Sequence, residues 1–171
     1  VQLLTVHAAK GLEWDVVVVP GLRDGGFPTM PTKETKGAKT KAWLTGSEAL
    51  PFPLRKDYED PDGTARLPAL DLDPGLDTDG VAEAIGDFQR AVAAHEVAED
   101  RRVAYVALTR ARSHMLLSGA WWSDAKQARS SSLFLDELAA AGLVGSGTEA
   151  GSGFSGTTPE GDNPLLASPV T

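Results

Sequence analysis

A short segment near the N-terminus, TVHAAKGLE, combines residue types that suit the recognition of phosphate and hydroxyl groups. Thr5 and His7 can donate hydrogen bonds to a phosphate, and Lys10 supplies positive charge. Gly11 lets the backbone approach a ligand closely, and Glu13 can accept a hydrogen bond from a hydroxyl group. A purely structural alternative stays open, in which His7 is a hydrogen-bonded loop histidine and Lys10 forms an i,i+3 surface pair with Glu13.

A second segment, EDRRVAYVALTRAR, carries an arginine that suits phosphoryl-transfer chemistry. Arg102, Val106 and Arg110 follow one another at intervals of four residues, so a helix places them roughly along one face. An arginine held at the end of such a helix can direct a rigid guanidinium at a phosphate group and stabilise the charge that develops there. Arg110 is therefore the candidate catalytic residue.

The same segment has a structural alternative, namely a helix held by ion pairs. Glu99 or Asp100 would then pair with Arg101 or Arg102. We expect Arg101 and Arg112 to be solvated or structural rather than catalytic.

Two apolar runs are predicted to be the strands that position the first segment. VQLLTV (1–6) is expected to be a buried strand, and DVVVVP (15–20) contains four consecutive valines. A continuous β-branched run predicts burial on both faces, as in a parallel sheet with helices above and below. Ligands bind beyond the carboxyl ends of such strands, so the polar segment between these runs is expected at a site.

Downstream, the pattern predicts a helix over residues 81–112, a strand over 114–122 and a helix over 133–142. Ser130–Ser132 offer N-caps for the last helix, and Gly142 suits its C′ position. The fold class is therefore α/β, a partial parallel sheet flanked by helices. The apolar residues of the first helix recur as one buried face requires, at Val81, Ile85, Phe88 and Val92.

Composition changes between about residues 21 and 80, where Gly and Pro recur, and this stretch is predicted to be a long irregular insertion. The chain after Gly145 is rich in Gly, Ser, Thr and Pro, so 1–145 is expected to form the domain and 146–171 a linker or tail. Order within the insertion is expected around Trp43, Leu44, Phe52 and Leu54. Its basic cluster is expected to be solvated, with contact to DNA phosphates as the alternative, and consists of Lys33, Lys36, Lys39 and Lys41.

The bulk composition excludes several classes of protein. The net charge of −8 argues against a chain that grips nucleic acid alone through a broad basic patch. Because there are no cysteines, disulfides, zinc-thiolate sites and cysteine nucleophiles are excluded. No apolar run is long enough to span a membrane and no secretory signal is visible, so the expected compartment is the cytoplasm.

Together, TVHAAKGLEW resembles motif V and EDRRVAYVALTRAR resembles motif VI of UvrD/Rep/PcrA-type superfamily 1A DNA helicases. The motifs occur in the family's order, each followed by a strand-like run, and the resemblance covers residues 1–28 and 96–122. It implies the C-terminal portion of the second RecA-like (P-loop NTPase-type) domain of an enzyme in DNA repair or recombination. In that family two RecA-like domains enclose ATP and Mg²⁺, single-stranded DNA crosses both domains, and movement is usually 3′ to 5′.

The resemblance also implies roles for individual residues. Arg110 matches the motif VI arginine finger that reaches the γ-phosphate. Glu13 matches the motif V acid that holds the nucleotide ribose, and Lys10 and Gly11 lie between the nucleotide and the DNA, which suits a coupling role. The positions that match motif V contacts near the DNA backbone are Thr5 and His7.

Five neighbouring side chains receive more ordinary expectations. Tyr105 is expected to pack, and Thr109 to form local hydrogen bonds. Trp14 is expected to fill a core, with stacking on a base as the alternative. At least one of Trp121 and Trp122 is expected to be buried.

Other parts of the family's active site have no counterpart in this sequence. It contains no GxxxxGK[ST] loop and no acidic Walker B pair, so the Mg²⁺ ligands are expected to lie outside this chain, and the isolated fragment is expected to be inactive. The expected partners are DNA and the N-terminal RecA-like domain. The stretches WLTGSEALPFPLRKD and NPLLASPV resemble actinobacterial helicase-nucleases of the RecBCD/AddAB kind, which would add a second subunit. The alternative function is an inactive helicase-like scaffold domain of such a machine.

Overall fold

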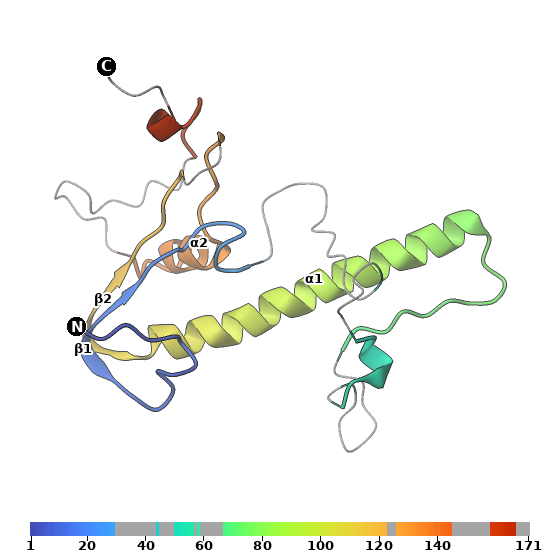
Figure 1. Ribbon diagram of the computed structural model, residues 1–171, viewed down its shortest axis with the longest axis horizontal. Coiled ribbons are helices and arrows are strands. Elements are labelled where there is room, and N and C mark those ends of the chain that lie inside the picture. The colour runs from blue at the N-terminus through green and yellow to red at the C-terminus, as the bar shows by residue number, and fades with distance from the viewer. Residues whose placement is uncertain are drawn as a thin grey trace. The chain divides into compact units, whose positions relative to one another are not determined.

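The computed structural model describes residues 1–29, 44, 50–56, 58, 67–122, 126–144 and 158–166. Two compact units divide the chain, one formed by Val1–Lys33 with Asp100–Thr171 and the other by Glu34–Glu99. The mixture of helices with a small parallel sheet confirms the predicted α/β class. In chain order the elements are β1 (Trp14–Val19), η1 (Phe52–Leu54), α1 (Thr78–Leu108), β2 (Ala111–Leu117), α2 (Leu133–Ala140) and η2 (Pro164–Leu166) (Figure 1).

The sheet consists of β1 and β2, which run parallel and side by side (Figure 1). Its register pairs Trp14 with Ala111 and Val19 with Leu117, with one irregularity after Trp14. The strand predicted around the four valines is confirmed. The strand predicted at 114–122 is displaced, because the chain turns directly after α1 and enters β2 at Ala111.

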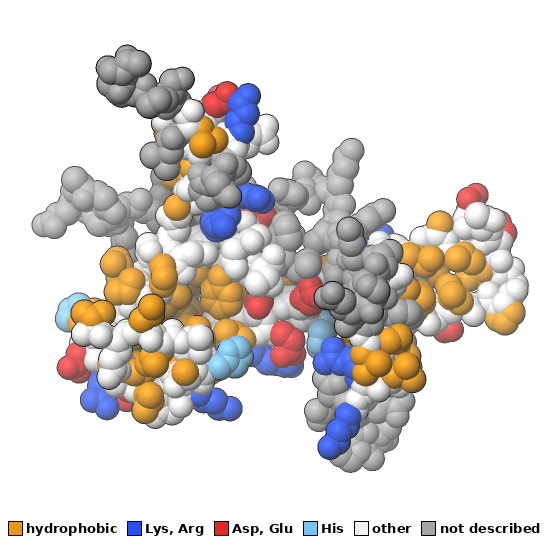
Figure 2. All heavy atoms as spheres, viewed as in Figure 1, with side chains coloured by type: hydrophobic (Ala, Val, Ile, Leu, Met, Phe, Trp, Pro, Cys, Tyr) orange, Lys and Arg blue, Asp and Glu red, His pale blue; other side chains and the backbone are white. Residues whose placement is uncertain are grey.

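The prediction that the valine strand is buried on both faces is wrong for this chain. Val16 and Val18 are 62% and 54% exposed, and Leu116, the register partner of Val18, is 58% exposed. Val19 and Leu22 are buried instead. Within the described residues the sheet is thus covered on one face only, and hydrophobic side chains gather at the surface over the strands (Figure 2).

The strand predicted at residues 1–6 is also wrong. Val1 and Leu3 are exposed, and no described strand pairs with them. The backbone instead turns, with the N–H of Ala9 donating to the carbonyl of Thr5 at 3.1 Å. The polar segment therefore does not follow the carboxyl end of a described strand. It precedes Trp14, at the amino end of β1.

Helix α1 confirms the predicted helix except at its ends. It begins at Thr78 and ends at Leu108, so Arg110 lies in the turn after the helix and Arg112 lies in β2. The predicted apolar face is buried only in its second half, since Phe88 and Val92 are 3% and 1% exposed whereas Val81 and Ile85 are half-buried.

Helix α2 has the predicted caps at both ends. The Ser132 side chain accepts a hydrogen bond from the Phe134 N–H at 3.2 Å. At the other end Gly142 has a φ of +68°, and the N–H of Leu143 donates to the Leu138 carbonyl at 2.9 Å, which is the Schellman pattern. The helix itself ends at Ala140, two residues before the predicted end. Phe134 anchors it through an edge-on contact with Phe27 at 5.3 Å.

The predicted insertion and tail are described only in part. The cluster Lys33–Lys41 and Trp43 lie outside the described residues, whereas Phe52 lies in η1 and contacts the Phe88 ring at 6.0 Å. Near the other end, Asp162 forms an isolated bridge with Gln127. The boundary between a domain at 1–145 and a tail stays a prediction. In the described part of the chain, no helix is long and apolar enough to cross a membrane.

Candidate functional site

The residues predicted from the first motif form a compact turn, which we call the turn segment (residues 5–13). Thr5 caps it, because its Oγ1 accepts a hydrogen bond from the Ala8 N–H at 3.2 Å. The N–H of Leu12 donates to the Ala9 carbonyl at 3.1 Å. Gly11 has a φ of +85°, in the left-handed region that favours glycine, and a Cβ there would meet nothing within 4 Å. Gly11 is thus required by the reversal of the backbone.

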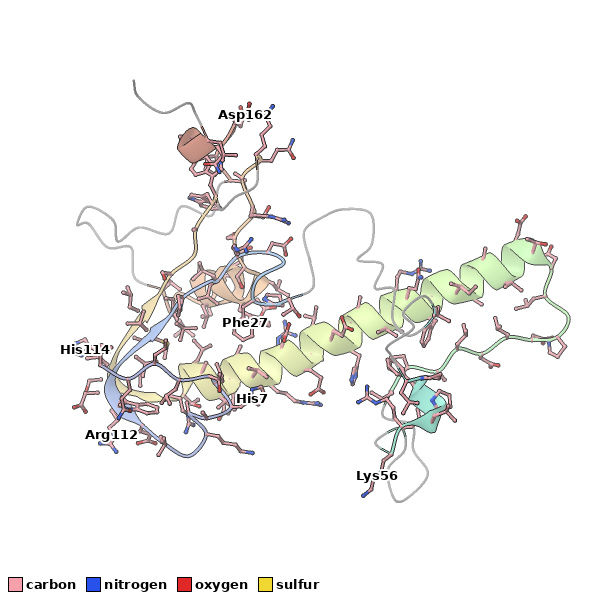
Figure 3. All side chains as sticks on the ribbon, in the orientation of Figure 1. His7, Phe27, Lys56, Arg112, His114 and Asp162 are labelled. Atoms are coloured by element: carbon pink, nitrogen blue, oxygen red, sulfur yellow. The ribbon has the colours of Figure 1, made fainter. Side chains whose placement is uncertain are left out.

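The turn segment presents its functional side chains to solvent. Ala9 is buried and anchors the turn. The predicted nucleotide and DNA ligands all come from this one turn and are exposed: Thr5, His7, Lys10, Gly11 and Glu13. His7 and Arg112 are labelled in Figure 3, on the turn segment and on the neighbouring strand.

The guanidinium of Arg110 is held by three hydrogen bonds. Its Nε donates to the Val106 carbonyl at 2.8 Å, its Nη2 donates to Thr109 Oγ1 at 2.8 Å, and its Nη1 donates to the Leu12 carbonyl at 3.1 Å. Arg110 is half-buried. Three of its five N–H groups thus have partners among the described residues, which leaves one N–H on each terminal nitrogen for an incoming acceptor.

The end of α1 explains why this arginine is so placed. The last carbonyls of a helix lack intrahelical partners, and cations near them are stabilised by the helix dipole. Here the Val106 carbonyl accepts from Arg110, and the Ala107 carbonyl accepts from the Arg110 backbone N–H at 3.2 Å. Arg110 therefore acts as a cap of its own helix.

Two of the ordinary expectations are decided at this helix end. Thr109 forms the predicted local hydrogen bonds, donating from Oγ1 to the carbonyls of Tyr105 at 2.8 Å and Val106 at 3.1 Å. The packing role expected for Tyr105 is wrong, since 69% of it is exposed. Ala104 and Ala107 are the residues buried on this part of the helix.

Three contacts join the turn segment and Trp14, the first residue of β1, to the chain that follows α1. Arg110 Nη1 donates to the Leu12 carbonyl, and the Trp14 N–H donates to the Arg110 carbonyl at 3.0 Å. Arg112 Nε lies 3.1 Å from Glu13 Oε2 in an ion pair. The structure therefore brings the turn segment to Arg110 and Arg112, with 98 residues of sequence between Leu12 and Arg110 and 99 between Glu13 and Arg112.

The remaining arginine and tryptophan expectations have mixed outcomes. Arg101 pairs with Glu137 of α2 and Arg112 with Glu13, as a solvated or structural role for both predicts. Trp14 is half-buried and its Nε1 donates to Gln2 Oε1 at 3.0 Å. Trp121 and Trp122 are both half-buried, so the expectation that at least one would be buried is wrong, even though the Trp122 Nε1 atom is inaccessible.

A groove of about 550 Å³ lies elsewhere, lined by the second half of β2, by the stretches that follow β1 and β2, and by α2. Leu22, Met115, Trp121 and Leu135 are among its lining residues, and none of the predicted site residues is. The groove therefore lies apart from the residues whose chemistry suggests a ligand site. The hydrogen-bonded cluster around Arg110 is the better candidate site, because its chemistry, and not only its shape, suits a ligand. Among the described residues no group of three or more His, Asp or Glu side chains could hold a metal ion.

Comparison with known proteins assigns the chain to a family. The family model described as "UvrD-like helicase C-terminal domain" matches residues 1–120, which include both the turn segment and Arg110. The chain belongs to this family. The fold of this UvrD-like domain is accordingly a partial RecA-like α/β fold, seen here as a two-stranded parallel sheet with its helices.

Individual relatives match a shorter part of the UvrD-like domain. A segment of 39 residues is 49% identical to proteins named "Probable DNA helicase II homolog" from Rickettsia conorii and from Rickettsia felis. "DNA helicase II" from Rickettsia typhi matches equally, at 49% identity over 39 residues. Each match covers 23% of this chain and 6% of the relative.

Sequence reasoning missed two contacts of Arg110 in the UvrD-like domain, those with the Leu12 carbonyl and with Thr109 Oγ1. The Leu12 carbonyl is a backbone atom, and no pattern of side chains indicates its position. Thr109 Oγ1 had a visible signal, because a threonine directly before the candidate arginine at a helix end can bond both the helix carbonyls and the guanidinium.

Proposed function

We propose that the chain is the part of an ATP-dependent DNA helicase or translocase that supplies the arginine finger, Arg110. The observation that carries this proposal is the fixed guanidinium of Arg110. It is half-buried, it is tied to two backbone carbonyls and a hydroxyl, and it keeps an N–H on each terminal nitrogen. A cation held in this way needs little reorganisation to meet developing negative charge.

The residues present fit a nucleotide as an external ligand. When bound in the full-length enzyme, ATP with Mg²⁺ supplies the phosphoryl group that is transferred to water. The remaining N–H groups of Arg110 suit a phosphate oxygen, as a forked donor does. Glu13 uses Oε2 for Arg112, so Oε1 is the oxygen proposed to accept from a ribose hydroxyl. The ligands of Mg²⁺ are proposed to come from the N-terminal RecA-like domain.

The turn segment is proposed to carry the single-stranded DNA contacts. Thr5 and His7 are exposed on the same turn whose Leu12 carbonyl holds Arg110. A displacement of the DNA strand would thus act on the same short piece of backbone that positions the arginine. Lys10 and Gly11 lie between the two sets of residues, which supports a coupling role.

Several finer expectations stay predictions. These are 3′ to 5′ movement, a role in DNA repair or recombination, a cytoplasmic location, and the actinobacterial helicase-nuclease subtype with its second subunit. No contact among the described residues favours the inactive scaffold function. Arg110 and Glu13 both keep the functional groups that catalysis and binding need.

The proposal is tested by Arg110→Ala in the full-length enzyme. We expect DNA-stimulated ATP turnover to fall by at least about a thousandfold, the usual effect of losing an arginine finger, while binding of a fluorescent ATP analogue is retained. The matched control is Arg101→Ala, because Arg101 pairs with Glu137 away from this cluster. Turnover of Arg110→Ala equal to that of the control would show that Arg110 is not the finger.

A further inference from the structure

Among the described residues, Thr109 is the one whose side chain forms a hydrogen bond with the Arg110 guanidinium. Its Oγ1 accepts a hydrogen bond from Arg110 Nη2 at 2.8 Å. The same hydroxyl donates its single proton toward the carbonyls of Tyr105 at 2.8 Å and Val106 at 3.1 Å. Because that proton is committed to the helix end, the oxygen lone pairs are left to face the guanidinium.

The other two hydrogen bonds of Arg110 go to backbone carbonyls, those of Val106 and Leu12. Arginine has a long side chain with many rotamers, so a single contact does not define its orientation. Backbone carbonyls hold Nε and Nη1, and Thr109 holds Nη2, the second terminal nitrogen. In the described part of the chain, Thr109 contributes the one side-chain oxygen in this set.

We infer that Thr109 is a positioning residue for Arg110, orienting the remaining N–H groups toward the phosphate. This inference rests on the proposed function of Arg110. Thr109 touches neither nucleotide nor DNA in this account and acts only through the arginine. Its loss should therefore lower kcat for ATP hydrolysis and leave KM for ATP unchanged, because the arginine acts on charge that develops in the transition state.

The test uses the full-length enzyme with Thr109→Val and Thr109→Ser. Valine keeps the branched shape and removes the hydroxyl, and we expect kcat to fall about tenfold, the effect of losing one hydrogen bond to a charged group. Serine keeps the hydroxyl and should retain kcat within about twofold of wild type. Ser113→Val is the matched control, since Ser113 is an exposed hydroxyl residue in β2 and should leave kcat unchanged. Thr109 is exposed, so neither variant opens a cavity.

A double-mutant cycle separates positioning from support of the helix end. If Thr109 acts through Arg110, Thr109→Val has no further effect on kcat in an Arg110→Ala background. A full additional tenfold loss in that background, or an unchanged kcat in the single variant, would overturn the inference. Failure of the proposed function is recognised separately, because Arg110→Ala alone would then have wild-type turnover.

Thr109→Ala serves as the second truncation if the valine variant does not fold. It also removes the hydroxyl, and it adds neither bulk nor β-branching at this exposed position. The same tenfold fall in kcat, with KM unchanged and the effect absent beside Arg110→Ala, supports the inference. Wild-type kcat in Thr109→Ala contradicts it.

Discussion

Arg110 donates a hydrogen bond from Nη1 to the backbone carbonyl of Leu12, at 3.1 Å and across 98 residues of sequence. This bond places the candidate catalytic cation against the turn that carries the candidate DNA ligands. The reciprocal bond from the Trp14 N–H to the Arg110 carbonyl fixes the backbones of the two segments to each other. A change in the backbone of the turn segment therefore changes what holds the arginine.

Glu13 is predicted to recognise the nucleotide ribose. Glu13→Gln in the full-length enzyme should raise KM for ATP by about tenfold and leave kcat nearly unchanged, because a hydrogen bond to a charged acceptor is weakened in the ground state and the transition state alike. The measurement is steady-state turnover with ATP and with 2′,3′-dideoxy-ATP. Wild-type enzyme should discriminate between the two nucleotides, and the Gln variant should do so far less.

Arg112→Ala is the control for that prediction. Its ion pair with Glu13 joins side chains that are 61% and 52% exposed, so the pair itself contributes little to stability. We expect KM for ATP to change much less than in Glu13→Gln. Equal effects of the two substitutions on KM would mean that Glu13 acts only through its ion pair with Arg112.

His7 is predicted to contact the DNA backbone. His7→Ala should weaken the affinity for single-stranded DNA by about twofold to tenfold, the effect of one lost hydrogen bond, with affinity for nucleotide retained. Fluorescence anisotropy with oligonucleotides of different sequence checks this, and the loss should be the same for each sequence. A DNA affinity equal to that of wild type would show that His7 does not contact the DNA.

The hydroxyl group of Ser132 is predicted to stabilise the fold. It is completely buried, its side chain bonds the Phe27 carbonyl, and it caps α2 by accepting from the Phe134 N–H. Ser132→Ala should lower the free energy of unfolding by about 1–2 kcal/mol. Urea unfolding of the chain measures this, with Ser113→Ala as the exposed control expected to change little.

Gly119 is predicted to tolerate no side chain. A Cβ at this position would lie 2.3 Å from the Leu22 carbonyl oxygen, a backbone atom that cannot rotate away. Gly119→Ala should destabilise the chain by about 1–3 kcal/mol. Gly86→Ala should instead stabilise the chain by about 0.5–1 kcal/mol, because Gly86 lies inside α1. The atom nearest to a Cβ there would be Nη1 of Arg90 at 3.4 Å, the end of a flexible side chain. Destabilisation of the same size in both variants would contradict the contact argument.

The sequence allowed prediction of those features that depend on residues close together along the chain. Helix α2 was predictable because Ser132 and Gly142 cap it by interactions within a few residues. The buried face of α1 followed from the spacing of Phe88 and Val92. These features depend on neighbours along the chain, which the sequence displays directly.

Features that depend on distant neighbours were not predictable. The apolar residues at 1–6 have strand-like composition, but a strand needs a partner, and no described strand pairs with them. Val16 and Val18 have the composition of a strand buried on both faces, yet burial depends on which elements cover the sheet. Arg110 was found by its type and position, whereas its bond to Leu12 could not be, because the acceptor is a backbone carbonyl.

The central claim is that Arg110 acts through the fixed geometry of its guanidinium. The most direct measurement is single-turnover hydrolysis of ATP by the full-length enzyme bound to single-stranded DNA, comparing wild type with Arg110→Lys and Arg110→Ala. Lysine keeps the charge but lacks the planar fork, so the account predicts that it restores only a small part of the rate lost in the alanine variant. A wild-type rate in either variant would contradict the account.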